Sequence, residues 1–220
     1  MGHRIRLDSP GGQVSGTISG SGGIGILLAH GAGTNQDHPF MAGLREALAR
    51  TGFLVMTFNY AYSERGSKRP DQTERLLSVH RAAADRMSGR VSSLFLAGRS
   101  MGGRMATYLA AEGYPAVGVV LYAYPLHPAG KEDRLRVTHL PEVKVPMLFF
   151  QGTRDPLSRM ELFDRHIRAL PNATVEVLEG ADHSFRGGGW GPEAVIERLA
   201  GETAKWIERV SSGTAVDSPP

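Results

Sequence analysis

A serine set between glycines is the strongest chemical signal in the sequence. The segment GRSMG, residues 98–102, follows the apolar run Ser93–Ala97 and opens a helix-like segment. In that context the pattern predicts a tight strand-to-helix turn that exposes the serine hydroxyl above a sheet. The N-terminus of the following helix offers free N–H groups to a developing negative charge. We therefore predict that Ser100 is a nucleophile rather than a serine that merely caps a glycine-rich turn.

A serine nucleophile needs a base, and the base needs an acid that orients it. Asp155 follows the apolar run Val145–Phe150, and His183 follows the run Thr174–Leu178. In a parallel α/β sheet, the loops beyond the strands meet at the same carboxyl edge. We therefore predict that Asp155 and His183 converge on Ser100 as the acid and the base.

Several of the eight histidines compete for the role of base. His127 follows the run Val117–Tyr122 and is the one credible rival. His30 ends an apolar run directly before a glycine loop, so it is expected to brace that loop by hydrogen bonding. Asp182 adjoins His183, but we do not expect it to be the acid, because the side chains of sequence neighbours point in different directions.

Stabilisation of an oxyanion requires two further N–H donors. One is expected to be the backbone N–H of Met101, which follows the nucleophile. The other is expected from the loop HGAG, residues 30–33, after the run Ile24–Ala29. Ala32 is the preferred donor in that loop, with Gly33 as the alternative.

The candidate site residues all lie beyond apolar runs that we expect to be buried strands, with helices between them. Continuous apolar runs are typical of strands buried on both faces of a parallel sheet. Six such runs are present, at Ile24–Ala29, Leu54–Phe58, Ser93–Ala97, Val117–Tyr122, Val145–Phe150 and Thr174–Leu178. Two weaker segments, Arg4–Leu7 and Val14–Ile18, are expected to add antiparallel strands at one edge.

Helix-like periodicity fills the gaps between these runs. A capping-box pair, Asp71 and Glu74, is expected to open a helix over 71–88, and Pro156 is expected at the start of another. A last helix is expected to begin near Gly191–Pro192. The alternation predicts an α/β fold with a mostly parallel central sheet and helices on both faces. Residues 1–210 are expected to form one domain, and 211–220 a disordered tail.

Composition excludes several other classes of protein. The chain of 220 residues has no cysteine, which excludes disulfides, thiol catalysis and thiolate metal sites. Its net charge is +3, and its basic residues are scattered rather than gathered in a stripe, so no nucleic-acid partner is expected. No signal peptide or membrane-spanning run is visible, which leads us to expect a cytoplasmic protein without a membrane partner.

The sequence holds no complete cofactor or metal motif. The segment GSGGIG, residues 20–25, matches GxGxxG in spelling but precedes a strand, whereas a dinucleotide loop follows one. The loop HGAG lacks the third glycine of that motif. No metal-binding motif is recognisable, so neither a cofactor nor a metal is expected.

The four segments HGAG, GRSMGG, GTRDP and GADHSF, in this order, resemble the α/β-hydrolase superfamily over about residues 20–210. The segments HGAGTNQDHPFM, FNY and YPLHPAGK are similar, more narrowly, to small hydrolases of the dienelactone-hydrolase branch. They also resemble the hydrolase-like domain of testis-expressed and chromatin-complex subunit proteins. Dienelactone hydrolases use a cysteine nucleophile, and Ser100 takes its place here.

This resemblance implies the α/β-hydrolase fold, in which a lid can follow the sixth core strand. The connection 122–145 is too short for a large cap domain, so an open site is expected. Its mouth is expected to be formed by Tyr60, Tyr124, Leu126 and His127.

The sequence thus predicts a serine hydrolase, of carboxylesterase type, that acts on a small acyl substrate without a cofactor. Two alternatives remain open at this point. One is a non-catalytic interaction module that keeps the hydrolase fold, since fold alone does not confer activity. The other is an acyltransferase that uses the same residues.

Overall fold

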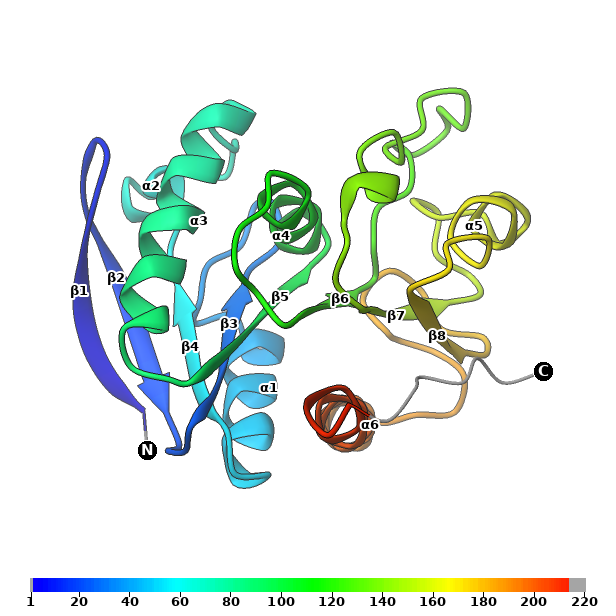
Figure 1. Ribbon diagram of the computed structural model, residues 1–220. Helices are drawn as coiled ribbons and strands as arrows, with labels where there is room; N and C mark the ends of the chain where they lie inside the picture. The colour runs from blue at the N-terminus through cyan, green and yellow to red at the C-terminus, as the bar shows by residue number, and fades with distance from the viewer. Residues whose placement is uncertain (1, 214–220) are drawn as a thin grey trace.

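The computed structural model describes residues 2–213, whose strands form one eight-stranded sheet (Figure 1). The strands are β1 (His3–Ser9), β2 (Gly12–Ser19), β3 (Ile24–Ala29), β4 (Leu54–Phe58), β5 (Ser93–Arg99), β6 (Gly118–Tyr122), β7 (Met147–Gly152) and β8 (Ala173–Leu178). Their order across the sheet is β1-β2-β4-β3-β5-β6-β7-β8. The pairs β1–β2 and β2–β4 are antiparallel and all others are parallel. The predicted sheet and its antiparallel edge are therefore confirmed.

Strand β3 lies between β4 and β5, so the chain leaves it first toward one edge of the sheet and later continues on its other side. Such a reversal of strand order is a topological switch point, where the loops beyond neighbouring strands diverge and leave a crevice. The loops that follow β3 and β5 are HGAG and GRSMG. The topology thus places both segments at the position where α/β sheets bind ligands.

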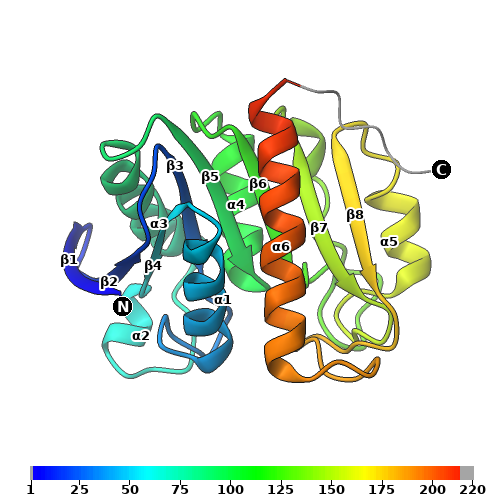
Figure 2. The same ribbon diagram turned by 90° about the horizontal axis from the view of Figure 1, so that it is seen from below.

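Helices cover both faces of the sheet (Figures 1 and 2). They are α1 (Pro39–Arg50), α2 (Ala61–Glu64), α3 (Thr73–Ser88), α4 (Met101–Ala111), α5 (Met160–His166) and α6 (Pro192–Ser211). Helices α1 and α6 lie side by side on one face, and α3, α4 and α5 lie on the other.

Strand β3 shows why both faces need cover. Ile26 and Leu28 belong to the core under α1 and α6, whereas Leu27 and Ala29 belong to the core on the opposite face. Successive side chains on a strand point to opposite faces, so a continuous apolar run must be buried on both sides.

The connection between β6 and β7 contains only a single 3-10 turn, η1 (Leu140–Glu142). This confirms that no large cap domain is inserted at this position. Within the described residues 2–213, no helix is long and apolar enough to cross a membrane.

Two predicted helix starts were wrong. Helix α3 begins after Gln72, whose side chain does not cap it, and the Asp71 carboxylate pairs with Arg65 at 2.6 Å. Helix α5 begins at Met160, not at Pro156. Residues 155–158 form a turn closed by the bond from Ser158 N–H to the carbonyl of Asp155, at 3.2 Å.

The last helix begins at Pro192, as predicted, but extends through Ser211. The first residues of the expected tail are therefore helical or part of the closing turn, since the Ser212 N–H still bonds to Glu208 O at 3.0 Å. The rest of that tail, 214–220, lies outside the described residues.

Candidate active site

The turn between β5 and α4 has the strained geometry that the GRSMG segment predicts. Ser100 adopts φ 51° and ψ −116°, a region that non-glycine residues rarely occupy. A Cβ on Gly98 would lie 2.3 Å from the Gly102 carbonyl carbon, and one on Gly102 would lie 2.4 Å from the Ala29 oxygen. Both contacts are with backbone atoms that cannot easily move. The two glycines are therefore required for α4 to approach β5 and β3 this closely.

The structure brings Ser100, His183 and Asp155 into one chain of hydrogen bonds. Ser100 Oγ lies 2.9 Å from His183 Nε2, and His183 Nδ1 lies 2.7 Å from Asp155 Oδ2. The carboxylate accepts a hydrogen bond from the Nδ1–H group, which leaves the Nε2 lone pair facing the serine hydroxyl. This is the arrangement that allows an imidazole to remove a proton from serine.

The Asp155 carboxylate is fully buried, and each of its oxygens has a donor. Oδ2 also accepts from Gln151 Nε2 at 2.9 Å, and Oδ1 accepts from the Leu157 N–H at 2.8 Å. Because a buried charge must be hydrogen-bonded to be tolerated, these donors stabilise the ionised form and hold its orientation toward His183.

The loop that carries His183 is held from two sides. Asp182 Oδ1 accepts the N–H groups of Ser184 and Arg186, at 2.7 Å and 2.9 Å. Asp182 is therefore a turn-forming residue and not the acid. From the other side, the Arg99 guanidinium donates to Ser184 Oγ at 3.0 Å. Arg99 precedes the nucleophile, so one side chain ties the Ser100 turn to the His183 loop.

The peptide between Gly31 and Ala32 has a fixed orientation. Three donors bind the Gly31 carbonyl: His30 Nδ1 at 2.8 Å, Thr34 Oγ1 at 2.9 Å and Tyr62 Oη at 3.3 Å. In a trans peptide the N–H points opposite to the carbonyl, so the Ala32 N–H is directed away from all three. Ala32 lines the same cavity as Ser100 and Met101.

Met101 lies at the first position of α4, where N–H groups lack partners inside the helix. The loop after β3 lies against this turn, since a Cβ on Gly31 would be 3.6 Å from Ser100 Cβ. The two predicted oxyanion donors, Ala32 and Met101, thus belong to segments that meet beside Ser100.

His30 braces its loop, in the way the sequence predicts. Its Nδ1 bonds to the Gly31 carbonyl, and its Nε2 accepts the Tyr60 N–H at 3.2 Å. One nitrogen donates and the other accepts, which requires a neutral ring. Burial, which disfavours the charged ring, lowers the pKa of His30 to about 4 despite the raising effect of the Gly31 bond.

His127, the rival base, has both ring nitrogens occupied away from Ser100. Nδ1 bonds to the Pro128 carbonyl at 2.9 Å, and Nε2 accepts the Arg159 N–H at 3.1 Å. The side chain is 1% exposed. His127 therefore joins two loops and is not available to accept a proton from the serine.

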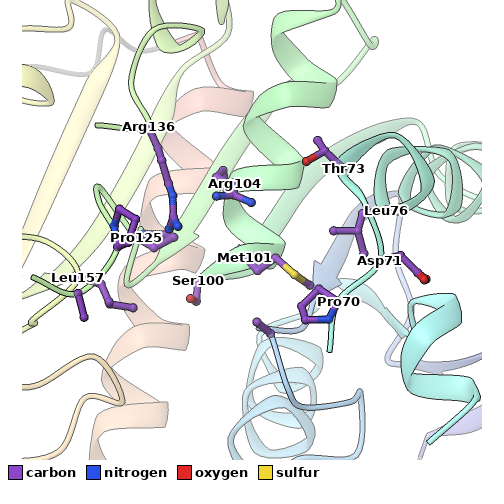
Figure 3. Close-up of a pocket in the computed structure, with 13 residues that line it drawn as sticks. Pro70, Asp71, Thr73, Leu76, Ser100, Met101, Arg104, Pro125, Arg136 and Leu157 are labelled. Carbon is purple, nitrogen blue, oxygen red and sulfur yellow. The ribbon is translucent and has the colours of Figure 1, made fainter. Parts of the chain in front are cut away.

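A cavity of about 410 Å³ opens beside Ser100 (Figure 3). The four residues expected at its mouth do not line it, and all are buried: Tyr60, Tyr124, Leu126 and His127. They lie behind the lining and support it. Tyr124 Oη, for example, donates to the carbonyl of Arg136 at 2.7 Å.

The cavity is instead lined by residues around the nucleophile, by residues from the segments 70–76 and 125–129, and by two arginines. Its lining residues are Ala32, Pro70, Asp71, Thr73, Leu76, Ser100, Met101, Arg104, Pro125, Pro128, Ala129, Arg136 and Leu157. Arg104 could have been found in the sequence, because it follows Ser100 by one helical turn. Arg136 and Gln151 carry no comparable local signal.

Among residues 2–213, no group of three or more His, Asp or Glu side chains is placed to hold a metal ion.

Comparison with solved structures gives matches that span nearly the whole chain. A dienelactone hydrolase from Anabaena variabilis is 21% identical with a TM-score of 0.75, covering 95% of this chain and 97% of that one. A Xanthomonas campestris protein described as an α/β serine hydrolase without lid is 18% identical with a TM-score of 0.70, covering 99% and 97%. An α/β serine hydrolase homologue from Coxiella burnetii is 19% identical with a TM-score of 0.73, covering 91% and 96%.

These likenesses establish the fold, and a family model extends the match to the sequence. The model of the alpha/beta hydrolase domain matches residues 23–208, which include the turn at Ser100 and the loops of Asp155 and His183. The chain therefore belongs to the alpha/beta hydrolase domain family.

Proposed function

We propose that this protein is a serine hydrolase that cleaves an ester bond of a small acyl substrate, in the manner of a carboxylesterase. The observation that carries the proposal is the hydrogen-bonded chain from Ser100 through His183 to the buried Asp155, at a strained strand-to-helix turn. An esterase from Pyrococcus furiosus and the dienelactone hydrolase, both structural neighbours of this chain, support the same reaction class.

In the first half of the reaction, Ser100 Oγ attacks the ester carbonyl carbon while His183 Nε2 takes the hydroxyl proton. Asp155 stabilises the imidazolium, and the N–H groups of Ala32 and Met101 receive the oxyanion of the tetrahedral intermediate. The carbon–oxygen bond to the alcohol then breaks, and the alcohol leaves with the proton from His183. An acyl ester of Ser100 remains.

In the second half, His183 removes a proton from water, and the hydroxide attacks the acyl-enzyme. The second tetrahedral intermediate expels Ser100 Oγ, which recovers the proton from His183, and a carboxylic acid is released. An alcohol acceptor in place of water would yield an ester, so product analysis with added alcohol separates hydrolysis from acyl transfer.

Labelling with a fluorophosphonate probe tests the nucleophile directly, since the probe phosphonylates an activated serine and releases fluoride. We expect wild-type protein to be labelled and Ser100→Ala to be unlabelled, with a loss of ester hydrolysis of about 10⁴-fold or more. Ser88→Ala, at the exposed end of α3, is the matched control and should label normally. Labelling of Ser100→Ala at the wild-type rate would refute the assignment, and an unlabelled wild type would favour a non-catalytic module.

A further inference from the structure

Two arginines lie on one wall of the cavity beside the nucleophile. Arg104 is on α4, one helical turn beyond Ser100, and its N–H bonds to the Ser100 carbonyl at 3.1 Å. Arg136 comes from the connection between β6 and β7. Both side chains line the cavity and lie on the same side of it as viewed in Figure 3.

Neither guanidinium is neutralised by a carboxylate within residues 2–213. By contrast, Arg159, two residues beyond the lining residue Leu157, pairs with Glu132 at 2.7 Å. Arg104 and Arg136 form no ion pair in the described part of the chain, and Arg104 Nε is buried there without a hydrogen-bond partner. A buried polar group without a partner is costly, so a ligand that accepts a hydrogen bond from this guanidinium would offset that cost.

The two charges also repel each other. Burial lowers the pKa of Arg136, and the positive charge of Arg104 lowers it further. Asp71 is the one carboxylate among the described lining residues. It pairs with Arg65 and lies across the cavity, with its carboxylate directed away from the two guanidinium groups (Figure 3). The wall formed by Arg104 and Arg136 therefore keeps a net positive charge that an anion would offset.

The position of His183 indicates which part of a substrate would meet this wall. A leaving alcohol takes its proton from His183 Nε2, so it must lie on that side of Ser100. His183 is not among the residues that line the cavity. The cavity and its arginines are thus left for the acyl portion.

We propose that Arg104 and Arg136 bind a carboxylate at the far end of the acyl chain, so that preferred substrates are hemiesters of short dicarboxylic acids. The planar guanidinium fork matches a carboxylate in bidentate fashion. Arg104 follows Ser100 by four residues, and the two residues line the same cavity, so a short acyl chain on Ser100 can extend toward the guanidinium groups. This inference rests on the proposed serine hydrolase and specifies its substrate class.

Three ethyl esters with the same three-carbon spacer test the proposal. They are monoethyl glutarate, its neutral isostere ethyl 5-methylhexanoate, and ethyl 4-phosphonobutanoate, with hydrolysis followed by pH-stat. We expect kcat/KM for the glutarate hemiester to exceed that for the neutral ester by about 10- to 100-fold, the range for a charge-assisted hydrogen bond. A greater preference for the phosphonate would assign the site to phosphate-type anions and overturn the carboxylate.

Variants then assign the preference to the two side chains. Arg104→Gln and Arg136→Gln should each lower the ratio of the hemiester to the neutral ester by about 10-fold, while Arg104→Lys should retain part of it. Arg134→Gln, an exposed arginine in the same connection, is the matched control and should leave the ratio unchanged. An equal fall in the control would attribute the effect to the overall field of the protein and refute the site.

The wild-type measurements decide the proposal even if a variant fails to fold. Fluorophosphonate labelling with equal turnover of the hemiester and the neutral ester would overturn the carboxylate site and leave the serine hydrolase intact. Absence of labelling and of turnover for all three esters would refute the hydrolase, and with it this substrate class.

Discussion

Acidification from pH 7.5 to pH 5 should destabilise this protein through two buried histidines next to the site. His30 and His80 are both fully buried, and burial lowers their pKa values to about 4 and about 3. The positive charge of protonated His30 lowers the pKa of His80 further. In the unfolded chain both rings titrate near pH 6.5, so between pH 6.5 and 4 the unfolded state binds more protons than the folded state.

The sign of the effect follows from this proton difference. Stability rises with pH wherever the unfolded state binds more protons, so the full stability is present above about pH 6.5 and is lost as the pH falls below it. At pH 5 each histidine lowers the free energy of unfolding by about 2 kcal/mol, or about 4 kcal/mol together. Such a loss is a large part of the 5–15 kcal/mol that is typical of a domain. Burial also lowers the pKa of His139, to about 4, which acts in the same direction.

Urea unfolding at the two pH values measures this loss. His80 Nδ1 lies 3.0 Å from Tyr60 Oη, and glutamine can replace that contact without titrating. In His80→Gln the loss between pH 7.5 and pH 5 should therefore shrink by about 2 kcal/mol, whatever the absolute stability of the variant. His3→Gln, an exposed histidine on β1, serves as the control and should show the wild-type loss. The same pH dependence in His80→Gln and wild type would refute the reasoning.

Three further predictions concern the site and its surroundings. His183→Ala should lower kcat/KM by several orders of magnitude. His127→Ala should mainly destabilise the fold, by about 1–3 kcal/mol in urea unfolding, because it leaves the Arg159 N–H unpaired. The reverse outcome would make His127 the base. Gly102→Ala should lower the free energy of unfolding by about 3 kcal/mol or more, because its Cβ would lie 2.4 Å from a backbone oxygen. Gly201→Ala, in α6 at a position where a Cβ meets no other atom, should raise it by about 0.5–1 kcal/mol in the same assay. Among neutral esters, those with roughly two to four acyl carbons should be hydrolysed best, because no cap domain encloses a long chain; a steady rise in kcat/KM with chain length would contradict the open site.

Local sequence determined the strands and the turn at Ser100. The runs Ile24–Ala29 and Leu54–Phe58 are strands with the predicted bounds, because a continuous apolar run must be buried on both faces wherever it lies. Gly98 carries similar local information, because a Cβ there would meet the backbone of Gly102, four residues away. Gly102, in contrast, is required by its contact with Ala29 on another strand. The positions of Asp155 and His183 beyond their strands followed from the same alternation.

Only the tertiary structure decided which side chains face the cavity. Tyr124 and His127 follow a strand just as Pro125 and Pro128 do, yet the first two are buried behind the lining that the prolines form. Their roles depend on partners from distant segments, such as the Arg159 N–H bound by His127. Arg136 enters the cavity for the same reason, since Leu126 and Tyr124 hold its backbone through bonds across the connection. Local sterics act within a few residues, whereas the direction of a loop side chain depends on contacts that form only when the whole sheet assembles.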